Sequence, residues 1–424
     1  MSMISRVGVS WRRALALSLL FGVVLALGGC GSSPAPSASS AQKCATSQAG
    51  PILYALVASL AASGQGITST TLEALDAQRG CLLWQVSQAG QMQYALGQGS
   101  IYLVTRPDFV YSTTPKMSTI FAYDARTGAL RWKVQEPVAG GIIATPGGLL
   151  FVETSNGSIA VPNLTYVALG AADGKPQWMY QTTLNMVVSG TTGYLYGLGR
   201  FPNLQYPNAV TALDLATGAE RWQVGQPTTP LWLVADSQAV YLGEEGAAGQ
   251  VNTLVALSAQ DGQPLWQFQA PDGMQPPASD GSTLYLSTSP TPTANSTPRG
   301  TLIALTAADG KERWSVPSDP LFGLTIANQT LFAGLGYGAV GYGKHGVDAL
   351  MVSDGSVRWK VGTQLGAQAP VVANGLVAIG LSGEVQGGPG TDSIEALSAA
   401  DGSVRWTIQT GGILQEALSL SAGG

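Results

Sequence analysis

The chain of 424 residues contains one histidine, His345, and three cysteines. A single histidine excludes a His-based metal cluster and leaves one candidate base for a Ser-His-Asp triad. No two cysteines are adjacent, and no Cys-x-x-Cys spacing exists. We interpret His345, which lies in a Gly-rich stretch, as a solvated loop residue. The sequence therefore predicts no catalytic residue, no metal and no cofactor, and indicates a protein that is not an enzyme.

Charge is also scarce, because charged residues make up only 11% of the chain while glycine numbers 55. This composition favours many short strands joined by turns over amphipathic helices. The first thirty residues carry three of the 20 basic residues and no acidic one, so the rest has 17 basic against 25 acidic side chains. Without a basic patch or run, the sequence predicts no nucleic-acid partner and no binding to an anionic membrane surface.

The N-terminus resembles a bacterial lipoprotein signal peptide. A basic region with Arg6, Arg12 and Arg13 precedes an apolar stretch, 14–27, that is too short to span a bilayer. It ends in Leu-Gly-Gly followed by Cys30, which resembles the lipobox. We therefore expect a signal peptide over 1–29, lipidation of Cys30, and a location on a bacterial membrane facing the periplasm or the cell exterior. The alternative is an ordinary signal peptide that contains a cysteine.

A segment rich in Ser, Pro and Ala follows the lipobox. It has no aliphatic side chain larger than Ala, so 30–49 is predicted to be a flexible tether that begins at Cys30. The remaining cysteines, Cys44 and Cys81, are expected to form a disulfide in an oxidising compartment. Two unpaired thiols are the alternative.

An internal repeat determines the predicted fold. Each repeat ends in a tryptophan that follows a glycine by four residues and an alanine by ten, as in AYDARTGALRW (122–132) and ALSAADGSVRW (396–406). The spacing between successive copies is 44 to 48 residues. The eight tryptophans are Trp84, Trp132, Trp178, Trp222, Trp266, Trp314, Trp359 and Trp406.

Each repeat reads as four antiparallel strands. The glycine provides the positive φ of a tight hairpin, and the returning strand carries the tryptophan. Four short strands in about 46 residues are typical of a propeller blade. The sequence therefore predicts an all-β fold, an eight-bladed β-propeller over 50–424. Seven blades with a spare unit is the alternative.

The first repeat lacks its first strand, because 52–59, 72–76 and 81–86 read as its second, third and fourth strands. The stretch 413–420, after the last tryptophan, matches a first strand. We expect this C-terminal strand to join the first blade and close the ring, which leaves no open edge.

The repeat, in its fullest form Ala-x-Asp-x-x-Thr-Gly-x-x-x-Trp, resembles the tryptophan-docking repeat of pyrroloquinoline-quinone-type propellers. The resemblance covers the chain from about residue 50 to the C-terminus and implies that each indole packs between blades as a structural residue. Some relatives are quinone-dependent dehydrogenases of alcohols or sugars, several of which cover the cofactor with a vicinal disulfide. Others are cofactor-free lipoproteins, including the scaffold propeller of the outer-membrane β-barrel assembly machinery. Length, the predicted anchor and the lack of catalytic residues favour the second group.

The loops between second and third strands are predicted to be long and to share one end of the ring, which we call the long-loop face. The tight turns occupy the opposite, short-turn face. Binding sites are often built from loops on a rigid scaffold. The candidate ligand face comprises Trp232, on a predicted innermost strand, and loop aromatics that otherwise serve loop packing: Phe109, Tyr111, Phe201, Tyr206, Tyr337 and Tyr342.

Acidic residues provide weaker candidates. Glu244 and Glu245 are predicted to lie on a loop, and Asp392 and Glu395 flank another, but none has the spacing of a calcium loop. We hypothesise a monomeric scaffold that binds a protein, peptide or glycan on the long-loop face and contacts the membrane only through the lipid on Cys30. The alternatives are a quinone-dependent dehydrogenase and, more weakly, a ligand sensor.

Overall fold

The computed structural model describes most of the residues that follow the predicted tether. These are 41–45, 50–61, 66–97, 99–106, 117–155, 164–182, 184–196, 209–226, 228, 230–245, 251–289, 299–336, 344–382 and 392–421. All of them belong to one compact unit, Pro36–Gly424. Cys30 and the predicted signal peptide lie outside the described residues. Among the described residues, no helix has the length and apolar character that a membrane span requires.

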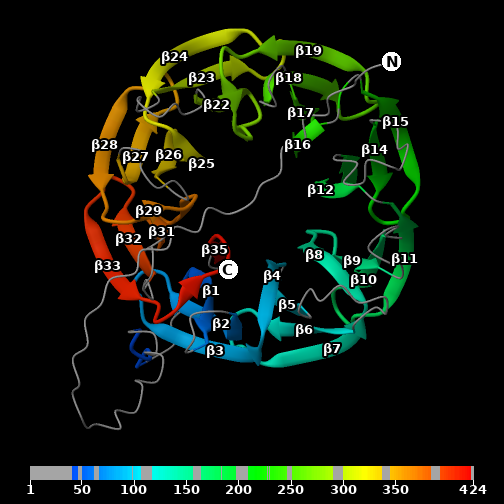
Figure 1. The fold of residues 1–424 in the computed structure, drawn as a ribbon, viewed down its shortest axis with the longest axis vertical. Coiled ribbons are helices and arrows are strands. Elements are labelled where there is room, and N and C mark those ends of the chain that lie inside the picture. Colours follow the sequence, from blue (N-terminus) through cyan, green and yellow to red (C-terminus); the bar gives the residue numbers. More distant parts are fainter. Residues whose placement is uncertain are drawn as a thin grey trace, which may run out of the picture. The chain divides into compact units, whose positions relative to one another are not determined.

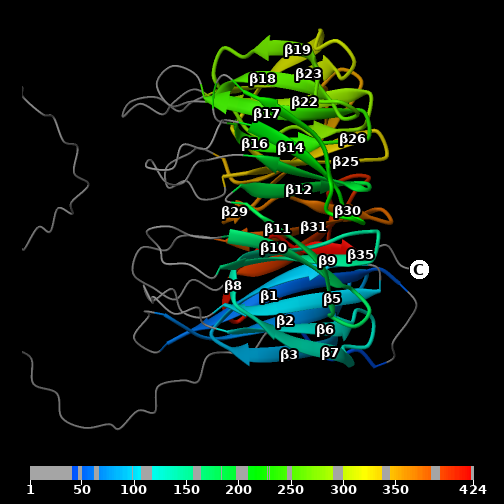
Figure 2. The same ribbon diagram turned by 90° about the vertical axis from the view of Figure 1, so that its right-hand side faces the viewer.

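The described chain forms eight antiparallel sheets arranged as the blades of a closed β-propeller (Figure 1). This confirms the predicted fold and blade number. Blade one contains β1 to β3, blade two β4 to β7, and the numbering continues around the ring to blade eight, β29 to β33. The strands run between the two faces of the ring, as the edge-on view in Figure 2 shows.

Each blade has four strand positions, from innermost to outermost. Around the propeller, the strands at each position form one of four concentric rings. The innermost strands are β4 (Gln91–Leu96), β8 (Val138–Ala144), β12 (Asn185–Ser189), β16 (Pro230–Ala235), β20 (Gly273–Met274) with β21 (Ala278–Ser279), β25 (Leu321–Ala327), β29 (Gly366–Ala367) with β30 (Val371–Ala373), and β34 (Ile413–Leu414) with β35 (Ser419–Ser421). The second strands are β1 (Ile52–Leu60), β5 (Ser100–Arg106), β9 (Leu149–Ser155), β13 (Thr192–Tyr196), β17 (Ala239–Glu245), β22 (Thr283–Ser289), β26 (Thr330–Leu335) and β31 (Leu376–Ser382).

The third and outermost strands form the hairpin of the repeat. The third strands are β2 (Ile67–Asp76), β6 (Ser118–Asp124), β10 (Leu164–Gly170), β14 (Ala209–Asp214), β18 (Val251–Ser258), β23 (Gly300–Thr306), β27 (Gly346–Met351) and β32 (Ser393–Ser398). The outermost strands are β3 (Leu82–Ala89), β7 (Leu130–Glu136), β11 (Pro176–Gln181), β15 (Glu220–Gly225), β19 (Pro264–Gln269), β24 (Glu312–Ser318), β28 (Val357–Gly362) and β33 (Val404–Gln409).

The apolar core consists of eight clusters, one in each junction between neighbouring blades. Alternation along each strand sends successive side chains to opposite faces of the sheet. Every blade therefore contributes side chains to the junctions on both of its sides. Burial of these apolar faces, at roughly 25 cal/mol per Å², is the main force that holds the blades together.

The repeated tryptophans link each blade to the next. Every indole donates its Nε1–H to a backbone carbonyl in the following blade at 2.9 to 3.2 Å, as Trp222 does to Ala259. The ring also lies flat against the turn glycine of that blade. A Cβ on Gly262, for example, would come within 2.7 Å of the Trp222 ring. The glycine is therefore required twice, for its positive φ of 72° and for the space it leaves.

An aromatic residue on the second strand packs against the tryptophan in seven of the eight blades. The ring centroids lie 5.2 to 6.1 Å apart in tilted pairs. These partners are Tyr54, Phe151, Tyr102, Tyr194, Tyr241, Tyr285 and Phe332, whereas blade eight has Ala378 at the same register position, opposite Ala396. The sequence carries a signal for this position, because an aromatic residue precedes each of the first seven tryptophans by 25 to 30 residues.

The C-terminal strands complete blade one, as the sequence predicted. β34 pairs with β1 through Leu414 opposite Val57, and β35 pairs with β1 through Leu420 opposite Leu53. The hydroxyl of Tyr94, on blade two, donates to the carbonyl of Ala417 at 3.0 Å. The ring is thus closed by a strand from the far end of the chain.

The last part of the predicted tether is bound to blade one. We call residues 41–45 the strap. Lys43 forms a parallel bridge with Leu82, and the Cys44 amide donates to the Leu82 carbonyl at 2.9 Å. Cys44 and Cys81 form a disulfide with their Cα atoms 5.1 Å apart. The flexible tether predicted for 30–49 is therefore held at residues 42–44.

Candidate functional site

The long-loop face is framed by the ends of the second strands and the starts of the third strands. The longest connections between consecutive strands fall here, for instance from Arg106 to Ser118 and from Ser289 to Gly300. The turns on the opposite face are short and are closed by glycines with positive φ, such as Gly128 and Gly310. The asymmetry between the two faces agrees with the loop lengths predicted from the sequence.

Six of the seven candidate ligand-face residues lie outside the described residues. They are Phe109, Tyr111, Phe201, Tyr206, Tyr337 and Tyr342. Their role in binding therefore remains a prediction.

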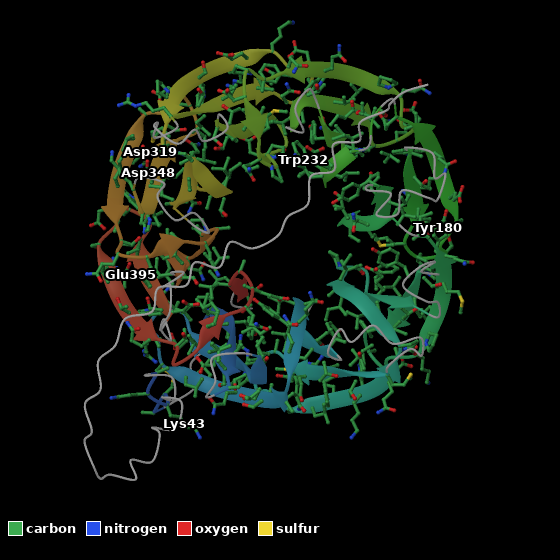
Figure 3. The ribbon with its side chains drawn as sticks, viewed as in Figure 1. Lys43, Tyr180, Trp232, Asp319, Asp348 and Glu395 are labelled. Carbon is green, nitrogen blue, oxygen red and sulfur yellow. A yellow bond between two sulfur atoms is a disulfide. The ribbon has the colours of Figure 1, made fainter. Side chains whose placement is uncertain are left out.

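Trp232 lies on β16, an innermost strand, as predicted (Figure 3). Its indole rests on Gly243, where a Cβ would come within 2.0 Å of the ring. It also packs against the apolar cluster between blades five and six, so much of the ring is used in packing. The indole Nε1 is buried and has no hydrogen-bond partner among the described residues. Trp232 is thus a partly buried residue with an unused donor.

Glu244 lies beside Gly243 on β17, and the prediction of an acidic pair on a loop was wrong. The strand extends through Glu245 because β18 continues to pair with it, with Glu245 opposite Val251. Glu244 is only 5% exposed. Burial raises the pKa of its carboxyl, and the Thr228 hydroxyl opposes this rise. Glu244 is therefore a buried acid at the long-loop end of blade five.

Blade seven carries a charged network at the same end of the ring that the sequence reasoning missed. Lys360 Nζ lies 2.5 Å from Asp348 Oδ2, on the adjacent strand, and Lys344 lies 3.6 Å from Asp319. Burial raises the pKa of the Asp348 carboxyl, while Lys360 lowers it. Its signal in the sequence is an acid directly before the alanine of the repeat, a position that is apolar in four of the eight blades and is also acidic in blades one and eight.

The other polar candidates have structural contacts. The ring of His345 packs against Gly336, so this histidine is half-buried rather than fully solvated. Asp392 is 2% exposed and accepts hydrogen bonds from the Leu414 amide at 2.7 Å and from the Ser382 hydroxyl. It therefore ties the closing strand to blade eight. Glu395 lies on β32, and burial raises the pKa of its carboxyl.

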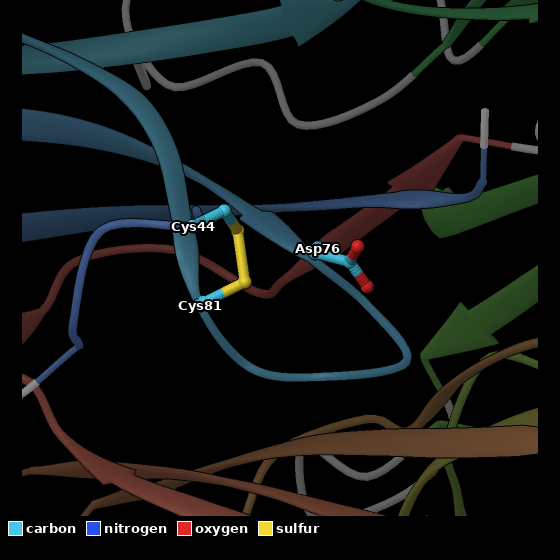
Figure 4. Close-up of side chains that lie close together, drawn as sticks. All are labelled: Cys44, Asp76 and Cys81. Carbon is cyan, nitrogen blue, oxygen red and sulfur yellow. A yellow bond between two sulfur atoms is a disulfide. The ribbon is translucent and has the colours of Figure 1, made fainter. Parts of the chain in front are cut away.

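Within the described ranges, one group of three potential metal ligands lies close together. The sulfurs of Cys44 and Cys81 and a carboxylate oxygen of Asp76 are within 4.8 Å of one another (Figure 4). The two sulfurs are bonded to each other, so neither is a thiolate ligand.

The described innermost strands, which line the central funnel of the ring, do not carry the charged groups that pyrroloquinoline quinone needs. This cofactor is an anion with three carboxylates and acts together with a bound divalent cation, so its site requires cationic side chains and carboxylate ligands. The innermost strands listed above contain no Lys, Arg, Asp or Glu. These strands therefore do not fit the cofactor.

A family model described as outer membrane protein assembly factor BamB matches residues 68–316, 250–333 and 300–423. No curated protein matches the chain significantly.

Several solved structures share the fold. Dihydro-heme d1 dehydrogenase NirN in complex with DHE is 8% identical with a TM-score of 0.61, covering 91% of this chain and 78% of that one. Quinohemoprotein alcohol dehydrogenase from Comamonas testosteroni is 14% identical with a TM-score of 0.51, covering 82% and 73%. BamB from Moraxella catarrhalis is 16% identical with a TM-score of 0.47, covering 83% and 95%. At these identities the likeness shows the fold alone.

Proposed function

Because the chain belongs to the family described as outer membrane protein assembly factor BamB, we propose that it is a non-enzymatic scaffold that binds a protein partner outside the cytoplasm. The observation that carries this proposal is that the residues of the repeat serve to join one blade to the next. In all eight blades the tryptophan, the turn glycine and the acceptor carbonyl are used in blade-to-blade contacts. The residues of the repeat therefore build the contacts between blades.

We place the partner on the long-loop face. The short-turn face is made of tight turns whose aspartates accept hydrogen bonds from their own backbone, as Asp214 does from the Thr217 amide. The long-loop face has the larger share of chain available for recognition, and Glu244 and Trp232 lie at its edge with buried polar atoms that lack partners among the described residues. Loops on a rigid scaffold are well suited to binding a protein or peptide.

Lipidation of Cys30 would attach the ring to a bacterial membrane, with the segment after it as a tether. We propose that the ring contacts the membrane only through this lipid and works as a monomer in the periplasm or at the cell surface.

Amine-specific crosslinking in cells tests the proposed face. Lys344, at the long-loop face, is 76% exposed, and Lys175 and Lys311, at the short-turn face, are 77% and 80% exposed. The three amines are therefore matched in accessibility. We expect crosslinks to a partner protein at Lys344 and none at Lys175 or Lys311. Crosslinks confined to the short-turn lysines would contradict the assignment of the face.

A Cys30→Ser variant tests the anchor separately. It should be found in the soluble extracytoplasmic fraction, whereas the unaltered chain should partition with membranes. Equal partitioning of the two proteins would contradict lipidation.

A further inference from the structure

The junction between blades eight and one differs from the other seven. Trp406 donates to the Ala77 carbonyl at 3.0 Å and lies on Gly80, as the repeat requires. However, no second-strand aromatic ring packs against it, because blade eight has Ala378 at that position. This is also the junction at which the two ends of the ring meet, since β34 and β35 pair with β1.

The strap lies at the outer rim of this junction. Lys43 is found where β33 and β3 come together, and not beside any other blade (Figure 3). Ala41 packs against the apolar cluster between blades eight and one, together with Leu82 and Trp406. The strap therefore adds apolar contact at the junction that lacks an aromatic partner.

The disulfide fixes the strap at the residue next to the docking surface. Cys81 directly follows Gly80, on which the Trp406 ring rests. The backbone pairing of the strap is short: Leu82 donates to the Gln42 carbonyl at 2.8 Å and accepts from the Cys44 amide at 2.9 Å. Each hydrogen bond of this kind adds only about 1 kcal/mol to the attachment of a chain segment. The covalent bond is consequently what keeps the strap in place.

We propose that the disulfide-held strap is a redox-sensitive latch on the junction that closes the ring. When the bond is intact, Ala41 and the strap backbone cover the rim of the junction and stabilise the docking of Trp406. When a dithiol reduces it, the S–S bond between Cys44 and Cys81 breaks into two thiols, and the reductant forms its own disulfide after giving up two electrons and two protons. The strap then detaches from Leu82. The backbone hydrogen bonds that pair β1 with β34 and β35 consequently open more often.

Hydrogen exchange followed by mass spectrometry tests the latch in the full-length protein. On addition of dithiothreitol, amides of β1, β34 and β35 should exchange about tenfold faster or more, while those of β16 and β17 in blade five stay unchanged. A Cys44→Ser/Cys81→Ser variant should show the fast exchange without reductant and no response to it. If that variant does not fold, the reduction of the folded protein gives the same comparison.

Two single variants separate the latch from the bond itself. Ala41→Asp keeps the disulfide but places a charge against the apolar cluster, so it should also speed exchange in β1 and β34. Lys43→Ala changes an exposed side chain of the strap and should have no effect. The proposal is overturned if reduction speeds exchange only within the strap and residues 80–82.

Discussion

At the scale of single residues, the fold depends on a contact between a tryptophan and a glycine of the next blade. The indole needs a flat surface and one acceptor, and the turn provides both, because its glycine has no side chain and the carbonyl three residues before the glycine accepts the indole N–H. An added methyl group meets the ring directly. It would come within 2.5 Å of Trp266 at Gly310 and 2.7 Å of Trp222 at Gly262. The blade-to-blade contact is therefore sensitive to the smallest substitution.

Gly262→Ala should lower the free energy of unfolding by about 3 kcal/mol, since it combines a positive φ with a clash. Gly281→Ala is the matched control. Gly281 has a φ of 86° but nothing lies within 4 Å of its Cβ position. Gly281→Ala should therefore lower the free energy of unfolding by about 1 kcal/mol, from backbone strain alone. Urea unfolding of the two variants measures the difference, and equal losses would show that the Trp222 contact contributes little.

Glu244 gives a pH-dependent prediction. Burial raises its folded pKa above the ordinary value of a glutamate, so the folded protein binds this proton more tightly than the unfolded chain. The resulting cost is absent below the unfolded pKa, grows between the unfolded and the raised folded pKa, and is constant above the folded pKa. Glu244→Gln should therefore stabilise the protein by about 1 kcal/mol at pH 7 and have no such effect near pH 4.

Thermal unfolding at both pH values measures this effect. Glu312→Gln, at an exposed residue of β24, should give no difference between the two pH values. A loss of stability in Glu244→Gln at pH 7 would mean that the charged form makes a favourable contact.

At the scale of elements, the C-terminal strand decides whether the ring closes. Only short stretches of β34 and β35 pair with β1, and the contacts around them complete the attachment: Tyr94 with Ala417 and Ser419, and Asp392 with the Leu414 amide. A chain that ends after Gly412 would leave β1 as an open edge beside an uncovered apolar cluster.

Truncation after Gly412 should abolish cooperative unfolding, whereas truncation after Ser421 should leave it unchanged. Tyr94→Phe provides a milder test that does not depend on accumulation of the shortened chain. It removes the donor to Ala417 and Ser419 and should cost about 1 kcal/mol in a denaturant titration. Unaltered stability in Tyr94→Phe would show that the hydroxyl contacts do not support closure.

Much of the blade structure could be predicted from the sequence because its signals are local and repeated eight times. The spacing from Ala122 to Gly128 to Trp132 encodes a hairpin, and the missing first strand before Ile52 points to closure by the C-terminus. The long-loop site could not be predicted equally well. Glu244 and Asp348 are buried by neighbouring blades, and the Asp348–Lys360 ion pair depends on strand register that alternation alone does not specify. The position of the strap depends on pairing in space with β3.

At the scale of the whole molecule, the ring is a rigid support whose polar candidates are gathered toward one face. The described innermost strands carry no charged side chain. The buried acids Glu244, Asp348 and Asp392 lie near the long-loop end of blades five, seven and eight, whereas Glu73 and Asp76 lie on β2 of blade one. The scaffold function that we propose rests instead on the family and on the use of the repeat in blade-to-blade contacts.

Titration of the purified protein with pyrroloquinoline quinone and calcium tests this account most directly, with thermal unfolding, absorbance and dye-linked oxidation of alcohols and sugars followed together. The account predicts no shift in unfolding temperature, no saturable change in absorbance and no turnover. Saturable binding accompanied by turnover would contradict it and would assign the funnel as an active site.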